Sequence, residues 1–146
     1  MKKIMFFALF LTVAVAAKSQ NLSVYIMDGP RGSVHKIDNE DYYRFTFRIT
    51  GLANDAAVKQ FIENCKSVPG IIDASVKEID NTGFRSVMLR LNDKKDDEFF
   101  KTLMTKTGIK KIYYQEKEYS PDNLEQLKQD RAKNNSQNPS SRKQAK

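Results

Sequence analysis

The chain has 146 residues and a formal net charge of +7, and this length predicts one compact domain with tails. Its single cysteine, Cys65, excludes an intramolecular disulfide. With one histidine and one cysteine, and with neither a glycine-rich phosphate loop nor a serine elbow, the sequence contains no recognisable catalytic set. We therefore expect a protein that is not an enzyme and needs no cofactor.

Residues 1–19 have the pattern of a secretory signal peptide. Lys2 and Lys3 form a positive start, an apolar run extends from Ile4 to Ala17, and small residues follow. A helix needs about 20 apolar residues to span a bilayer, so this run is short for a stable anchor. We expect the segment to be cleaved, which leaves a periplasmic or secreted protein with no transmembrane segment.

The positive charge is concentrated at the C-terminal end. Residues 128–146 carry six basic side chains against Asp130, a net charge of +5, whereas the chain without Lys2, Lys3 and Lys18 carries +4. Residues 20–127 are therefore close to neutral, at −1, which argues against nucleic acid as a partner of the domain. Because residues 128–146 contain no large apolar side chain, we expect a disordered basic tail. Its charge favours weak contact with anionic surfaces.

Residues 20–41 are predicted to form an N-terminal strand or hairpin. Apolar and polar side chains alternate from Asn21 to Met27, as they do in a strand, and turn-forming residues follow from Asp28 to Gly32. Residues 33–38 are expected to pair back on that strand. His35 has no neighbouring residues at a metal-ligand spacing, so we expect a surface histidine.

The next stretch predicts a strand, a helix and the start of another strand. Alternation from Tyr43 to Thr50 is typical of a half-buried strand. Asn54 or Asp55 is placed to cap a helix, and the apolar face of that helix carries Val58, Phe61, Ile62 and Cys65. On this face Cys65 is expected to be a small buried residue rather than a reactive thiol.

The remaining elements are predicted from similar patterns. Residues 71–79 and 84–91 are expected to be strands joined by a turn at 81–83, with Ile72, Ala74 and Val76 on one face of the first. A helix capped by Asn92 or Asp93 ends at Gly108, and residues 109–116 form the last strand. In the segment 120–146, a short helix through Leu124 and Leu127 precedes the disordered tail.

The order β-α-β-β-α-β across residues 42–119 predicts an α+β fold of the ferredoxin-like sandwich type. Two helices would cover one face of the sheet, and the first and third of these strands would be central neighbours. The other face would be polar and partly basic, with Arg44, Arg48 and Arg90 among its residues.

From Tyr43 to Tyr119 the sequence resembles the heavy-metal-associated domain of small copper chaperones and metal-pumping ATPases. The resemblance lies in the segments FRITGL, SVPGI, SVKEI and SVMLRL, and it implies the ferredoxin-like fold. In that family a Gly-Met-x-Cys-x-x-Cys loop after the first strand binds a soft metal through two thiolates. Here Asn54 and Ala57 stand at the positions of the two cysteines, so the resemblance implies a degenerate metal site.

We therefore expect an exported, non-catalytic module that binds a protein partner in the cell envelope. Its predicted contact points are the open sheet face, an edge strand that accepts another strand, or the loop after the first strand, with Leu52, Asn54 and Asp55. The alternative is a heavy-metal binding or transport protein with non-standard ligands, for example Cys65 with Met88 or His35.

Overall fold

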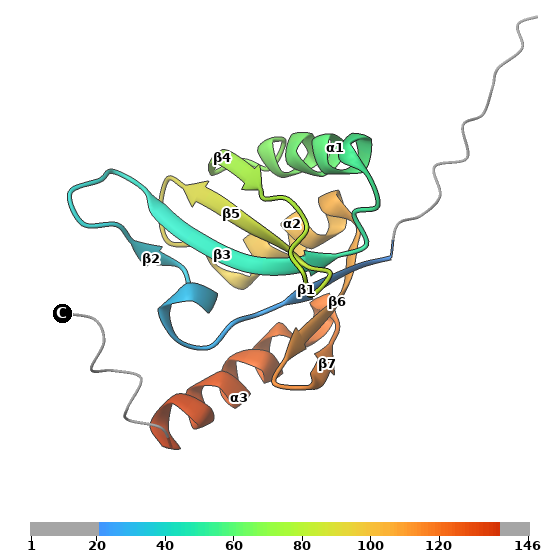
Figure 1. The fold of residues 1–146 in the computed structure, drawn as a ribbon. Helices are drawn as coiled ribbons and strands as arrows, with labels where there is room; N and C mark the ends of the chain where they lie inside the picture. The colour runs from blue at the N-terminus through green and yellow to red at the C-terminus, as the bar shows by residue number, and fades with distance from the viewer. Residues whose placement is uncertain (1–20, 138–146) are drawn as a thin grey trace, which may run out of the picture.

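The computed structural model describes residues 21–137, in which a seven-stranded sheet packs against three α-helices (Figure 1). This arrangement confirms the predicted α+β class. The predicted signal peptide, residues 1–19, lies outside the described residues, as do residues 138–146. Within residues 21–137, no helix is long and apolar enough to cross a membrane.

The strands are β1 (Leu22–Tyr25), β2 (His35–Lys36), β3 (Tyr43–Thr50), β4 (Ile71–Val76), β5 (Arg85–Leu91), β6 (Ile109–Tyr114) and β7 (Lys117–Tyr119). The α-helices are α1 (Asp55–Lys66), α2 (Asp97–Thr107) and α3 (Leu124–Gln137). Two 3-10 turns complete the fold, η1 (Gly29–Gly32) and η2 (Pro121–Asn123). The strand order is β4-β5-β3-β1-β6-β7, and β2 also pairs with β3.

The central strand β3 follows the sequence pattern closely. Phe45, Phe47 and Ile49 are buried, while the alternate residues Arg44 and Arg48 point to the other face. β3 pairs antiparallel with β5, as predicted for the first and third strands of the β-α-β-β-α-β order.

The N-terminal strand is built into the middle of the sheet. β1 lies between β3 and β6, antiparallel to the former and parallel to the latter. The strand predicted within residues 20–41 is therefore present, but the pairing of residues 33–38 back onto it is wrong. β2 pairs instead with Tyr43 and Arg44 of β3. Because η1 carries the chain onward along the same edge of β3, β1 and β2 act as one interrupted strand.

The first two helices begin at side-chain caps. The Asn54 carboxamide oxygen accepts the Ala57 N–H at 2.9 Å, as predicted for α1. The predicted cap of α2 is wrong, because Asp96 rather than Asn92 or Asp93 accepts the Phe99 N–H, at 2.9 Å. The side chains of Asn92 and Asp93 bind the Lys95 ammonium instead.

The predicted face of β4 is wrong at one residue. A register shift between Ile71 and Asp73 forms a bulge, which leaves the Ile72 side chain 50% exposed. After β6, the chain reverses through Gln115 and Glu116, which both have positive φ, into the unpredicted strand β7.

The largest departure from prediction is α3. The helix continues to Gln137, so the predicted disorder is wrong for residues 128–137. Leu124 and Leu127 are buried, as expected for the start of the helix. Hydrogen bonds of Asp130 and Arg131 to residues outside the helix hold the following turns.

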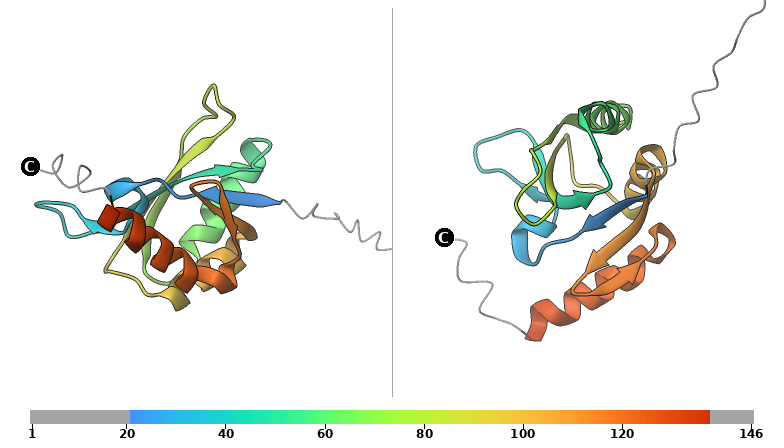
Figure 2. Two further views of the ribbon diagram at one scale, coloured as in Figure 1. Left: turned by 90° about the horizontal axis from the view of Figure 1, so that it is seen from below. Right: turned by 45° about the vertical axis from the view of Figure 1, so that its right-hand side comes forward.

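The helices cover one face of the sheet. Figure 1 shows α2 behind the sheet and α3 beside β6 and β7, and both views of Figure 2 keep α3 next to that edge. The loop 77–84, between β4 and β5, crosses the front of β3 in Figure 1, over the opposite face. The sheet therefore has a helical face and a polar face.

Candidate functional site

A cavity of about 360 Å³ lies between the sheet, α2 and α3. The sheet contributes Val24, Phe45, Phe47 and Ile112 to its wall. Helix α2 contributes Phe100, Leu103 and Met104, and α3 contributes Leu124 and Leu127. Pockets that bind small molecules have volumes of this order and largely apolar walls.

The wall of this cavity is part of the hydrophobic core. Ile112 is fully buried, and Phe47, Leu103 and Val24 are no more than 3% exposed. These side chains cannot turn away from the cavity without unpacking the sheet from the helices. The cavity is thus a feature of the fold rather than of one mobile surface side chain.

Cationic side chains gather on the solvent side of the cavity. The lining includes Asp97 and four basic residues: Lys94, Lys95, Lys128 and Arg131. Two of these charges are balanced, because Lys128 pairs with Asp97 and Lys95 pairs with Asp93. Lys94 is exposed and forms neither an ion pair nor a hydrogen bond with any residue from 21 to 137.

Arg131 ties α3 to the segment before β2. Its Nη1 donates to the Gly32 carbonyl oxygen at 2.6 Å, and its Nη2 donates to Ser33 Oγ at 2.9 Å. Burial lowers the pKa of the guanidinium, yet arginine remains protonated near neutral pH. Both acceptors are neutral, and no carboxylate among residues 21–137 forms an ion pair with Arg131. The Asp28 carboxylate and Tyr114 also interact with the guanidinium and oppose the lowering of its pKa. The half-buried positive charge at the cavity is therefore compensated only in part.

Asp130 anchors the other side of α3. Its Oδ2 accepts hydrogen bonds from Tyr119 Oη at 2.7 Å and from Lys117 Nζ at 3.1 Å. These two hydrogen bonds, Tyr119 first, lower the pKa of the Asp130 carboxyl. Burial, together with the Asp130 hydrogen bond, raises the pKa of Tyr119 to about 12. Helix α3 is thus positioned by polar contacts on both sides as well as by two leucines.

Sequence reasoning assigned Lys128 and Arg131 to a disordered tail and so missed the cavity. One signal was present: Leu124, Leu127, Lys128 and Arg131 occupy positions i, i+3, i+4 and i+7, which share one helical face. Only two of the four are apolar, which is why the hydrophobic pattern stopped at Leu127.

The predicted contact loop has mainly structural tasks. Leu52 is only 5% exposed and belongs to the core, and Asn54 caps α1. Asp55 is exposed at the start of the helix. Ala57, at the position of the second family cysteine, is 7% exposed and packs in the core. Partner binding by Leu52, Asn54 and Asp55 stays a prediction.

The residues suggested as non-standard metal ligands do not converge. Cys65 is fully buried on the helical face of the sheet. Met88 alternates with the buried Val87 and Leu89, so its side chain lies on the polar face. The Nδ1 of His35 lies 3.1 Å from the Ser33 carbonyl oxygen. Among residues 21–137, no three His, Cys, Asp or Glu side chains are grouped to hold a metal ion.

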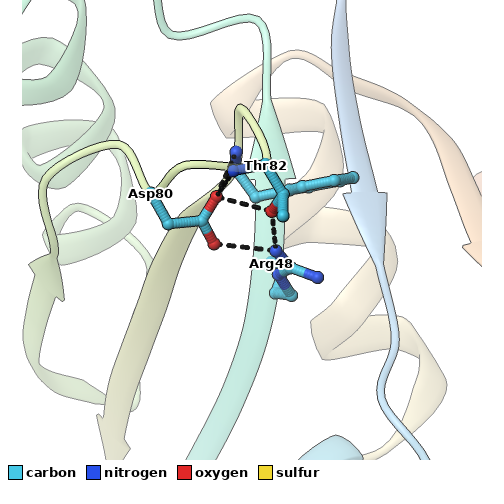
Figure 3. Close-up of polar contacts among 4 residues, drawn as sticks. Arg48, Asp80 and Thr82 are labelled. Atoms are coloured by element: carbon cyan, nitrogen blue, oxygen red, sulfur yellow. Dashed lines mark hydrogen bonds and ion pairs between the residues drawn. The ribbon is translucent and has the colours of Figure 1, made fainter.

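The polar face carries a network that holds the loop 77–84 down. Arg48 Nη2 donates to Asp80 Oδ2 at 2.7 Å and to Thr82 Oγ1 at 2.6 Å, and the Thr82 hydroxyl donates to Asp80 Oδ1 (Figure 3). The Arg48 guanidinium also lies 4.0 Å from the centroid of the Phe84 ring. These contacts account for Arg48 as a structural residue.

Arg44 and Arg90 form a second cationic region on the polar face. The two residues stand directly opposite each other on β3 and β5, and Arg90 lies over the Tyr42 ring at 4.2 Å. Neither forms an ion pair within residues 21–137. This region confirms the partly basic face expected from the sequence, but the residues that line the cavity lie elsewhere.

The cavity is the candidate site with both a defined volume and a chemically consistent lining. Comparison with known proteins adds no constraint: no family model, no curated protein and no solved structure matches the chain. A function can therefore be inferred only from the geometry and chemistry of residues 21–137.

Proposed function

We propose that this chain is an exported, non-catalytic module that binds a small apolar ligand in the cavity between the sheet, α2 and α3. The observation that carries the proposal is the cavity itself, about 360 Å³ of space with buried apolar side chains along its wall. Space of this size and lining supports a binding role.

The size of the cavity limits the ligand. A methylene group takes up roughly the volume of one water molecule in the liquid, about 30 Å³. On that basis the cavity has room for one chain of up to about twelve carbons rather than for two such chains. Each Å² of apolar surface that such a chain removes from water contributes about 25 cal/mol to binding.

We further propose that residues 42–119 form a ferredoxin-like sandwich related to the heavy-metal-associated domain, with β1 inserted between β3 and β6. The β-α-β-β-α-β order and the pairing of β3 with β5 support this proposal. Soft metals bind thiolate or thioether ligands, whereas Asn54 caps α1 and Ala57 packs in the core. A ligand in the cavity is therefore a better proposal than a metal at the family's loop.

Export and a partner in the cell envelope complete the proposal. The signal-peptide pattern of residues 1–19 supports export, and a small exported binding module would deliver its ligand to another protein. We expect mass spectrometry of the protein from its native cells to give a mature chain that begins near residue 20. A chain that retains Met1 in the cytoplasm would contradict export.

The proposed function is tested with the neutral apolar dye N-phenyl-1-naphthylamine, whose fluorescence rises in an apolar site. We expect saturable binding to the natural chain with displacement by decan-1-ol. Ile26 lines the cavity, so Ile26→Phe should fill part of it and weaken binding by about tenfold, the equivalent of about 1.4 kcal/mol.

Ile79→Phe is the matched control, because Ile79 is 58% exposed and lies outside the cavity lining. This variant should bind the dye within about twofold of the natural chain, since surface substitutions have small effects. Equal loss in both variants, or no saturable binding by the natural chain, would reject the proposal. So would a natural dimer that Ile26→Phe dissociates, since a second copy would then occupy the site.

A further inference from the structure

The solvent side of the cavity is charged, whereas the rest of its wall is apolar. Four basic side chains and one carboxylate line its solvent side, and the ion pairs of Lys95 and Lys128 balance two of the positive charges. Lys94 and Arg131 are the two cations at the cavity without an ion pair to any residue from 21 to 137.

Arg131 and Lys94 differ in how firmly their side chains are held. Arg131 is half-buried and held by two hydrogen bonds to neutral acceptors, so its position is fixed. The Asp28 carboxylate interacts with the guanidinium without forming an ion pair, so the charge is compensated only in part. Lys94 is exposed on the segment before α2 and is free to turn toward a bound group. The fixed guanidinium of Arg131 and the mobile ammonium of Lys94 together form a site that can bind an anion. This site lies beside the apolar cavity.

We infer that the ligand is a single-chain amphiphile with an anionic head, such as a free medium-chain carboxylate, whose head binds at Arg131 and Lys94. The alkyl chain then lies against Phe47, Ile112 and Leu127. This inference rests on the proposed function, because it names the class of ligand for the same cavity. Asp97 is held by Lys128, so the carboxylate at the cavity is already neutralised and does not repel the head.

Three probes with the same ten-carbon chain and different head groups distinguish the contribution of the head group to binding from that of the chain. Calorimetry with decanoate, decan-1-ol and decyltrimethylammonium should give the tightest binding for decanoate and the weakest for the cation. We expect decanoate to exceed decyltrimethylammonium by at least about tenfold at low salt, and this ratio should shrink as salt screens the charges.

Substitutions of Lys94 and Arg131 test whether these residues bind the anionic head group. Lys94→Gln should weaken decanoate by about threefold, as for an exposed ion pair, and Arg131→Gln should weaken it by about tenfold, as for a charged hydrogen bond. In both variants the affinity for decan-1-ol should stay within about twofold of that of the natural chain. Arg131→Lys keeps the charge and should recover part of the loss. Arg44→Gln removes the same charge from the polar face and should change neither ligand.

The outcomes separate the two proposals. Equal affinity for decanoate, decan-1-ol and decyltrimethylammonium would overturn the anionic head but leave the apolar ligand standing, whereas no binding of any probe would reject the proposed function itself. Binding to phosphatidylglycerol vesicles without binding of monomeric decanoate would also overturn the inference. Since Arg131 helps to hold α3, its variants are first compared by thermal unfolding. Lys94→Gln, which removes no contact with residues 21–137, keeps the test decisive.

Discussion

Cys65 is the only cysteine, and its side chain is fully buried between α1 and the sheet. Burial raises the pKa of the thiol to about 12, so almost none of it is thiolate near neutral pH. We predict that a disulfide reagent labels the native protein at least about 100-fold more slowly than the unfolded protein, since only the thiolate reacts. Rapid labelling of the native protein would mean that the thiol is accessible and reactive.

Asn54 is the residue whose structural role the sequence predicted most directly. Its side chain accepts the Ala57 N–H at 2.9 Å and caps α1. Asn54→Ala should lower the free energy of unfolding by about 1 kcal/mol, as for other lost caps, whereas Asn54→Asp keeps an acceptor and should be nearly neutral. Urea unfolding of both variants measures the difference. Equal loss in both would show that the cap is not what Asn54 contributes.

Helix α3 depends on polar contacts that sequence patterns do not reveal. Tyr119→Phe removes the hydroxyl that donates to Asp130 at 2.7 Å. We expect amide hydrogen exchange in α3 to rise by about fivefold, because the helix opens locally more often, while exchange in β3 stays unchanged.

Tyr25→Phe is the control for that change. It removes a hydroxyl from the polar face, where Tyr25 stacks on Tyr113 at 4.8 Å between ring centroids. Exchange in α3 should then match that of the natural chain. If Tyr119→Phe also left α3 unchanged, the two leucines alone would hold the helix.

The elements that could be predicted are those with a clear hydrophobic period. β3 alternates strictly, β5 places Val87, Leu89 and Leu91 at every second position, and α1 repeats apolar residues at helical spacing after Asn54. The place of β1 could not be predicted, because its alternation is compatible with any position in the sheet. The bulge at Ile72 also left no mark in the residue pattern.

The cavity could not be predicted because α3 was not. After Leu127 the helix contains no large apolar residue, so composition favoured disorder, although Leu, Glu, Gln, Lys and Ala are good helix formers. What decides the outcome is pairing with distant residues, Arg131 with Gly32 and Asp130 with Tyr119. Contacts between residues so far apart in the sequence are determined by the tertiary structure.

Carboxylates of the polar face, together with Asp130 on α3, contribute to the response of the whole molecule to acid. The hydrogen bond from the Thr82 hydroxyl, followed by those from the Phe84 N–H and Arg48, holds the pKa of Asp80 well below its usual range. The Tyr113 hydroxyl and Lys111 lower the pKa of Glu118 in the same way. A carboxyl with a lower pKa in the folded state stabilises the fold above its unfolded pKa, and this contribution is lost as the pH falls toward its folded pKa.

We therefore predict that the free energy of unfolding falls as the pH drops below about 4. Asp80→Asn should lower stability near pH 7 and make the decline in acid shallower, because one linked proton is gone. Urea unfolding at several pH values measures both effects. Asp38→Asn, in the exposed loop before β3, is the control. An Asp80→Asn variant with an unchanged acid slope would contradict the role given to this network.

The most direct test of the cavity as the functional site is a methyl NMR titration of the natural chain with decanoate. We predict saturable shifts of the methyl groups of Val24, Ile112 and Leu127, which line the cavity from the sheet and from α3. The methyl groups of Met88 and Thr46, on the polar face, should not move. Shifts confined to the polar face, or no shifts at saturating decanoate, would contradict ligand binding in the cavity.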